Sequence, residues 1–323
     1  MDVTRARMSS WMTSVWLAGL ATMLQFGAAQ ARAAHTPPSR QEIPQIPQIP
    51  EAREVFAEQM SGKPSPDDLG SMLPPEIPAV TIASLIVPAD DRGPVGMVGL
   101  KPWAARPGWF VALACTGGNG PSKARVDGCS GGGSSTPLHA YVALLEKDGS
   151  GRLKLATRPV TIETNVDWSR SMLPNSPEAA ETPAPEDRSA LLPSAYDRLD
   201  LAPYRIAPGE TAFGVRASWS DGYAGGFGWH SAMLLYAPVD GQLRQVLAVP
   251  TIALTFTAGE WHRDGTRDHE IEEGANVIIV TQHLNAGYAD LVVRSRTTAD
   301  ERLFRWDAVG KRYAEAAERR RHP

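Results

Sequence analysis

The sequence predicts an all-β protein whose strands form an antiparallel sandwich or barrel built from meander hairpins. From residue 77 onward, β-branched and aromatic segments of strand length alternate with Gly, Asn and Asp turns. No long amphipathic helical segment separates them, so the alternating βαβ order of a parallel sheet is not expected. A propeller-like arrangement of the same hairpins is the less favoured alternative.

The first 33 residues have the three parts of a secretory signal peptide. Arg5 and Arg7 precede an apolar run over residues 11–29, and Ala31-Arg32-Ala33 forms an A-x-A triplet. Polar residues interrupt the run, which falls short of the ~20 apolar residues that a spanning helix needs. We expect cleavage after Ala33, a periplasmic or secreted location and no membrane span in the mature chain. The alternative is an uncleaved anchor.

A proline-rich linker is predicted over residues 34–76. Its repeat Ile-Pro-Gln-Ile-Pro-Gln-Ile-Pro over residues 43–50 predicts an extended polyproline-II spacer, and a recognition ligand for a partner is the alternative. The β domain follows over residues 77–313. A basic tail over residues 314–323 ends the chain.

Each predicted strand is a segment rich in β-branched or aromatic residues. The predicted strands cover residues 80–87, 109–114, 140–145, 153–164, 200–206, 211–219, 233–236, 243–249, 251–257, 277–282, 290–294 and 303–306. Two hairpins resemble each other, since residues 139–145 and 230–235 are both followed by an Asp-Gly turn that supports strand pairing. This is either a repeated unit or convergence of hairpin chemistry.

A long excursion interrupts the strands over residues 165–197, where acidic residues, prolines and alanines follow no periodicity. A segment of this length without its own secondary structure is often functional. We expect it to leave the β domain and to cover or gate a surface.

Charge and cysteine content limit the function classes. The chain has 32 basic and 36 acidic residues and a formal net charge of −4, with one basic cluster at residues 319–321, so it lacks the footprint of a nucleic-acid binder. An even pair of cysteines in an exported protein predicts a disulfide between Cys115 and Cys129. A metal-binding pair is the alternative, but the spacing is much wider than C-x-x-C.

Two motifs resemble catalytic or metal sites. Ser130 lies in a formal G-x-S-x-G, but this elbow needs a strand before it and a helix after it, and polar residues flank it here. His262 and His269 lie among carboxylates over residues 260–270, but Arg263 and Arg267 oppose a cation. We expect a charged hairpin loop there, and predict no catalytic residue, metal site or cofactor.

Residues 287–307 resemble part of an FG-GAP repeat of the integrin-α or VCBS type, through Gly-Tyr-Ala-Asp-Leu-Val-Val followed by Leu-Phe-Arg-Trp-Asp. The resemblance implies a β-meander. The calcium-binding acidic positions of that family fall on Gln282, Leu284 and Ala286, so only Asp290 matches and a calcium site is not implied. The chain otherwise resembles secreted bacterial β-rich proteins.

The densest aromatic segment predicts a binding site. Trp219, Tyr223, Phe227 and Trp229 are separated by glycines, and they would share one face if the segment kept a single strand register. The alternative is a cap over the core. We expect a non-catalytic binding module of the cell envelope that engages a glycan, a peptide or a protein partner. A secreted hydrolase whose site is assembled from residues distant in sequence is the alternative.

Overall fold

The computed structural model describes residues 47–50, 52–54, 57, 67–91, 93–117, 129–131, 138–177, 192–223, 225–265 and 267–316. They belong to one compact unit, Pro44–Pro323. The other unit, Met1–Ile43, holds the predicted signal peptide and lies outside the described residues, as do the end of the predicted tail and residues 178–191 of the predicted excursion.

Besides the helical residues 50, 52–54 and 57, the described elements are helix α2 and a series of strands. In chain order they are α2 (Ala79–Ile86), β1 (Val95–Pro102), β2 (Trp109–Gly117), β3 (Cys129–Ser130), β4 (Leu138–Lys147), β5 (Leu153–Leu155), β6 (Val160–Thr161), β7 (Ala195–Ala207), β8 (Glu210–Tyr223), β9 (Gly226–Val239), β10 (Gln242–Trp261), β11 (Arg267–Asn285), β12 (Tyr288–Ser295), β13 (Glu301–Asp307) and β14 (Arg312–Glu315).

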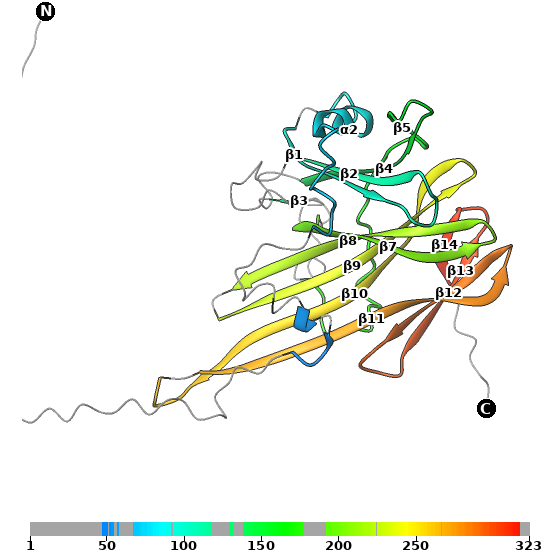
Figure 1. Ribbon diagram of the computed structural model, residues 1–323. Helices are drawn as coiled ribbons and strands as arrows, with labels where there is room; N and C mark the ends of the chain where they lie inside the picture. The colour runs from blue at the N-terminus through cyan, green and yellow to red at the C-terminus, as the bar shows by residue number, and fades with distance from the viewer. Residues whose placement is uncertain are drawn as a thin grey trace, which may run out of the picture. The chain divides into compact units, whose positions relative to one another are not determined.

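The strands form two antiparallel sheets, which confirms the predicted all-β class (Figure 1). The smaller sheet has the order β1-β2-β4-β5, and β6 also pairs with β4. The larger sheet has the order β14-β13-β12-β11-β10-β9-β8-β7-β3. From β7 to β14 each strand pairs with the next along the chain, which is the meander that the hairpin turns predict.

The two sheets pack face to face around a shared core. Leu113 of β2 and Leu144 of β4 belong to the same buried cluster as Phe213 of β8 and Leu234 of β9. These side chains are fully buried, and along each strand they alternate with residues that face the other side. The sandwich therefore follows from the period-two spacing of apolar residues in both sheets.

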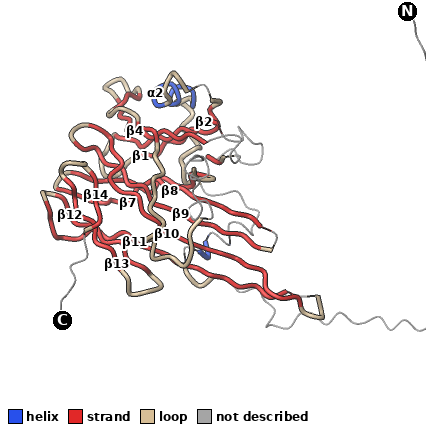
Figure 2. Tube along the Cα trace, turned by 180° about the vertical axis from the view of Figure 1, so that it is seen from behind, coloured by secondary structure: helices blue, strands red, loops and turns tan. Residues whose placement is uncertain are grey.

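The outer faces of the sheets are covered differently. Helix α2 packs Ile82 and Ile86 on the far side of the smaller sheet. The larger sheet curls, so that β12 lies against β7 and β14 lies against β10 (Figure 2). Leu291 of β12 and Trp306 of β13 thereby share a second core with Leu235 of β9.

The prediction of a strand over residues 80–87 is wrong, because this segment forms α2. Its buried residues are Ile82, Ala83 and Ile86, which recur at helical rather than alternating spacing. Pro78 precedes the first helical residue in an extended conformation, a position at which proline is tolerated. The β-branched side chains favoured a strand, but the packing face decided the structure.

The strands predicted over residues 243–249 and 251–257 are one strand, β10. Proline cannot donate a hydrogen bond inside a sheet, so Pro250 predicted a break. The structure instead places a register shift between Pro250 and Ile252 in the pairing with β9, and the strand continues. A β-bulge thus accommodates the proline in the middle of the sheet.

Residues 67–72 connect the two sheets, and we call them the bridging segment. Leu100 of β1 donates its amide to Gly70 O, and Leu199 of β7 donates its amide to Asp68 O, at 2.9 and 3.0 Å. The Arg198 guanidinium also donates to Asp68 Oδ2 at 2.7 Å. The backbone of this segment runs so close to β1 that a Cβ on Gly99 would lie 2.1 Å from Leu69 O.

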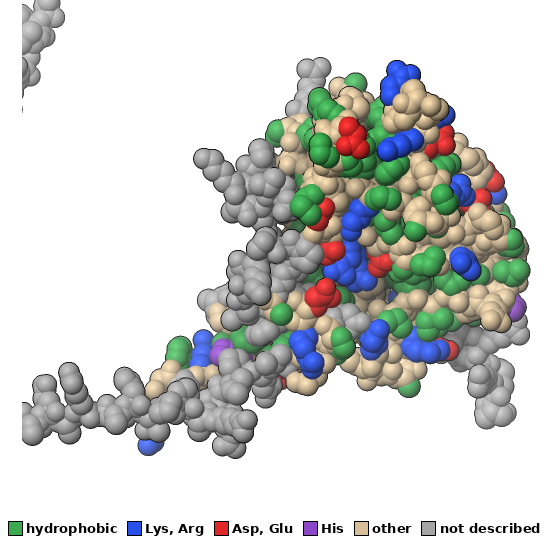
Figure 3. Space-filling view, in the orientation of Figure 1, with side chains coloured by type: hydrophobic (Ala, Val, Ile, Leu, Met, Phe, Trp, Pro, Cys, Tyr) green, Lys and Arg blue, Asp and Glu red, His purple; other side chains and the backbone are tan. Residues whose placement is uncertain are grey.

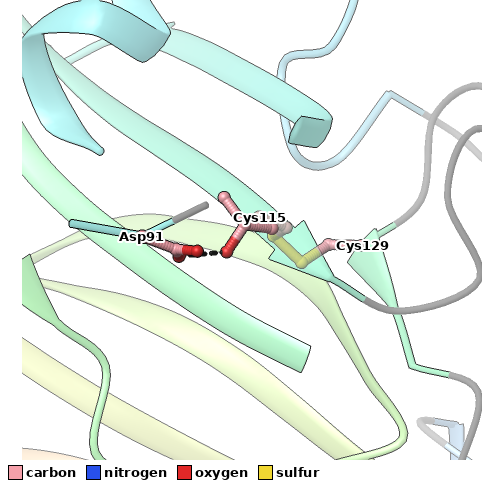
Figure 4. The surroundings of a disulfide bond; sticks show 4 residues. Asp91, Cys115 and Cys129 are labelled. Carbon is pink, nitrogen blue, oxygen red and sulfur yellow. Dashed lines mark hydrogen bonds between the residues drawn. A yellow bond between two sulfur atoms is a disulfide. The ribbon is translucent and has the colours of Figure 1, made fainter. Parts of the chain in front are cut away.

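The predicted disulfide between Cys115 and Cys129 is present, with Cα atoms 5.8 Å apart (Figure 4). It connects β2 of the smaller sheet with β3 of the larger sheet. Beside it, Asp91 accepts hydrogen bonds from Thr116 and Tyr141. Burial alone would raise the pKa of Asp91, but these hydrogen bonds outweigh it and lower the pKa. Burial and Asp91 raise the pKa of Tyr141 to about 12.

Replacing both cysteines with alanine is expected to lower the free energy of unfolding by about 3 kcal/mol. The bridge closes a loop with a sequence separation of 14, and its loss restores that loop's entropy to the unfolded chain. Urea unfolding of the oxidised protein and the double variant measures the difference. Equal midpoints and slopes for the two proteins would contradict the expectation.

Candidate functional site

The predicted aromatic segment forms the hairpin of β8 and β9, and its rings do not share one face. Trp219 pairs with His230, whereas Trp229 pairs with Ser220 and Phe227 pairs with Gly222. Residues paired across two antiparallel strands lie on the same face. Trp219 shares a face with its partner His230, which is the neighbour of Trp229 along β9 and faces the other way. Trp219 therefore lies on the opposite face from Phe227 and Trp229. Tyr223 ends β8, and its side chain is not among those described.

Trp219 is 4% exposed and belongs to the core between the sheets. Its ring lies edge-on to Trp168 at 5.2 Å between centroids. Trp168 comes from the predicted excursion, which here covers this face of the larger sheet. His230 Nε2 lies 3.1 Å from Asn175 Oδ1, and Asn175 donates to Glu272 of β11. Trp219 thus packs the interior and presents no ring to a ligand at the surface.

Phe227 and Trp229 are half-buried on the opposite face, where other aromatic groups join them. Phe227 pairs with Phe256 of β10, and the two rings stack at 5.6 Å between centroids and 12° between planes. The other side of Phe256 meets the His269 ring at 4.6 Å. We call residues 220–229 and 254–273 the arm, and this side of it the arm face.

The hairpin of β10 and β11 continues past β9, whose last pair with β10 joins Gly226 and Thr257. Trp261 lies at its end and is 69% exposed. The Arg267 guanidinium carbon lies 5.3 Å from the Trp261 ring centroid, in a cation–π contact. In Figure 3, hydrophobic, basic and histidine side chains gather at the described end of this hairpin. The arm therefore ends in an exposed tryptophan held by an arginine.

The end of the proline-rich repeat contacts the same strands. The amides of Gln48 and Ile49 donate to Glu273 Oε1 at 2.7 and 3.1 Å. Glu273 belongs to the arm face, because it pairs with Leu254, which pairs with Trp229. The segment predicted as a spacer is therefore attached to the arm at this point.

The charged residues over 260–270 form the end of the hairpin. His262 Nε2 lies 2.9 Å from Asp268 Oδ1, and Arg267 Nε donates to Gly259 O. His269 belongs to the aromatic stack instead. Within the part of the chain that the structure describes, no three His, Cys, Asp or Glu side chains are grouped as metal ligands.

The pKa of His262 is expected to lie above its ordinary value of 6.5, because Asp268 accepts its hydrogen bond and favours the imidazolium. The pair stabilises the hairpin end below pH 6.5, and this contribution is lost as the pH rises through the folded-state pKa. Titration of the His262 ring protons by NMR measures the shift, and Asp268→Asn should lower the pKa. A value at or below 6.5 in the parent protein would contradict the contact.

The remaining sequence candidates lie elsewhere. Ser130 ends β3 and pairs with Ala195 of β7. Asp290, the acidic residue of the FG-GAP resemblance, has a buried carboxylate that lies 2.8 Å from His283 Nδ1 and 3.5 Å from Arg305 Nε. The Asp290 carboxylate is thus already paired with a histidine and an arginine.

The chain matches no protein-family model, no curated protein and no solved structure. Among the described residues, no helix has the length and apolar character that crossing a membrane requires.

Proposed function

We propose that the chain is an exported, non-catalytic binding module, and that the arm face engages an extended segment of a peptide or protein partner. The observation that carries the proposal is Trp261, a large ring that is 69% exposed at the end of a hairpin and is oriented by Arg267. Tryptophan and arginine are the residues most enriched among those that dominate binding energy at interfaces.

The ring geometry favours a peptide over a glycan. Glycan binding by aromatic residues uses a flat ring face, and both faces of Phe256 already contact Phe227 and His269. Arg267 covers one side of the Trp261 ring. Ring edges, one tryptophan face and the adjoining backbone remain, and these suit side chains and amides of an extended chain.

Export is supported by the A-x-A triplet at residues 31–33 and by the disulfide, which persists in oxidising compartments. Expression of the full chain in a secreting bacterial host tests it. N-terminal sequencing of protein from the periplasm or medium should begin at Ala34. An intact Met1 on membrane-bound material would overturn the export proposal.

The binding proposal is tested with the full chain on arrays of immobilised random peptides and of glycans. We expect peptide ligands, and we expect Trp261→Ala to weaken the best of them at least tenfold in solution. Val309→Ala is the control, because Val309 is a 93% exposed apolar residue in the turn between β13 and β14. It should change affinity less than twofold.

Three results would overturn the proposal. One is an absence of ligands on the peptide array. Another is a set of ligands found only among glycans. The third is equal loss of affinity in Trp261→Ala and Val309→Ala, which would place the binding surface away from the arm.

A further inference from the structure

β11 has an open edge over residues 267–274. Strand β10 pairs with this stretch on one side, through the run from Ile252 with Ala275 to Trp261 with Arg267. On the other side, β12 begins to pair with β11 only at Asn276. Within the described residues, therefore, half of β11 has a neighbouring strand on one side alone.

The hydrogen bond at Ala275 shows in which direction the backbone N–H and C=O groups on this edge point. Arg296 donates its amide to Ala275 O at 2.8 Å, on the side where β12 lies. Backbone groups in a strand alternate in direction, and the pairing with β10 has no irregularity between Ala275 and His269. The N–H and C=O groups of His269, Ile271 and Glu273 therefore point away from β10. Among the described residues no backbone group pairs with them.

The two faces of this edge differ in chemistry. On one face, Asp268, Glu270 and Glu272 are all exposed and recur at every second residue. Asp268 contacts His262, and Glu272 accepts from Asn175, but a carboxylate has about four lone-pair sites and can accept further donors. On the other face, the half-buried Ile271 pairs with Phe256.

We propose that this edge binds an extended basic peptide as an added strand. The proposal rests on the proposed binding function and names its partner class. The backbone of the added strand forms hydrogen bonds with the outward N–H and C=O groups of His269, Ile271 and Glu273. Because opposed side chains of paired strands lie on one face, Lys or Arg at every second position meets the three carboxylates. The intervening apolar residues meet Ile271.

The same carboxylates argue against a second copy of this chain as the occupant. Two copies paired edge to edge would bring two rows of carboxylates together, and like charges directly opposite each other are destabilising. The three carboxylates therefore favour a positively charged partner over a second copy of the chain.

The probe is the fluorescent peptide Lys-Val-Lys-Val-Lys-Val-Lys with blocked ends, titrated with the full chain by fluorescence anisotropy. We expect saturable binding that weakens as salt is raised. Two further peptides are N-methylated on the backbone, one at its three valines and the other at its four lysines, so that each lacks the donors of one edge of the strand. At least one of them should bind at least tenfold more weakly. The acidic peptide Glu-Val-Glu-Val-Glu-Val-Glu should not bind.

Protein variants locate the site. Glu270→Lys should weaken the basic peptide at least tenfold, whereas Glu301→Gln, at an exposed carboxylate on β13, should change affinity less than twofold. Equal affinity of the parent peptide and of both N-methylated peptides, the one methylated at valine and the one methylated at lysine, would overturn strand addition. Equal affinity of the acidic peptide would overturn the charge argument. If the array ligands still depend on Trp261 while the basic peptide fails, this inference is wrong and the proposed function stands. Failure of both overturns both.

Discussion

Trp219→Ala is expected to lower the free energy of unfolding by about 3–5 kcal/mol, the cost typical of removing a buried large aromatic side chain. The ring is 4% exposed and lies edge-on to Trp168 in the core between the sheets, so its removal leaves a cavity that the rigid strands on either side cannot fill. Urea unfolding followed by far-UV circular dichroism measures the loss.

The matched control is Trp261→Ala, which removes the same ring from an exposed position. Its unfolding free energy should differ from the parent by less than about 0.5 kcal/mol, as is usual at the surface. Trp219 lies in the aromatic segment over residues 219–229 and Trp261 in the separate charged segment over residues 260–270. This pair of variants separates packing from binding. A similar cost for both variants would contradict the assigned positions.

Gly99→Ala is expected to cost about 3 kcal/mol, at the upper end for overpacking. The new Cβ would lie 2.1 Å from Leu69 O, a distance that real contacts do not reach. The bridging segment must therefore move away from β1, which breaks the bond from the Leu100 amide to Gly70 O. Hydrogen exchange should show loss of protection at Leu100 and Leu199.

Gly96→Ala provides the control for this variant, because Gly96 lies in the same strand and its Cβ would meet only ordinary contacts at 3.8 Å. We expect no loss of stability, or a gain of up to about 1 kcal/mol from reduced freedom of the unfolded chain. Equal destabilisation by the two alanines would show that β-strand propensity, rather than the close approach of Leu69, sets the cost.

The sequence predicts most of this fold because its strands follow period-two burial and its turns contain positive-φ residues. Gly241 and Gly287 have φ values of 74° and 85° in the turns that join β9 to β10 and β11 to β12. Strands β1, β3 and β14 were not predicted, and β1 shows one reason. β1 holds Gly96, Gly99 and Pro102, residues that disfavour strands, and it forms because β2 and the bridging segment pair with it.

The candidate site is harder to predict than the fold. The faces of Trp219, Phe227 and Trp229 depend on where the hairpin turns, and a shift of one residue exchanges the two faces. The stack of Phe227, Phe256 and His269 joins three strands, so the spacing along any one strand does not reveal it. Trp261 lay in a segment that the sequence identified only by its charges.

The bridging segment also determines how the fold bears mechanical load. Tension applied to the chain ahead of Asp67 reaches β1 through Gly70 and β7 through Asp68 at the same time. The ion pair between Arg198 and Asp68 adds a third attachment beside them. Once the bonds of Gln48 and Ile49 to Glu273 are broken, a pull from the proline-rich side is therefore divided between the two sheets. It must break several bonds together, rather than peel one strand away a bond at a time.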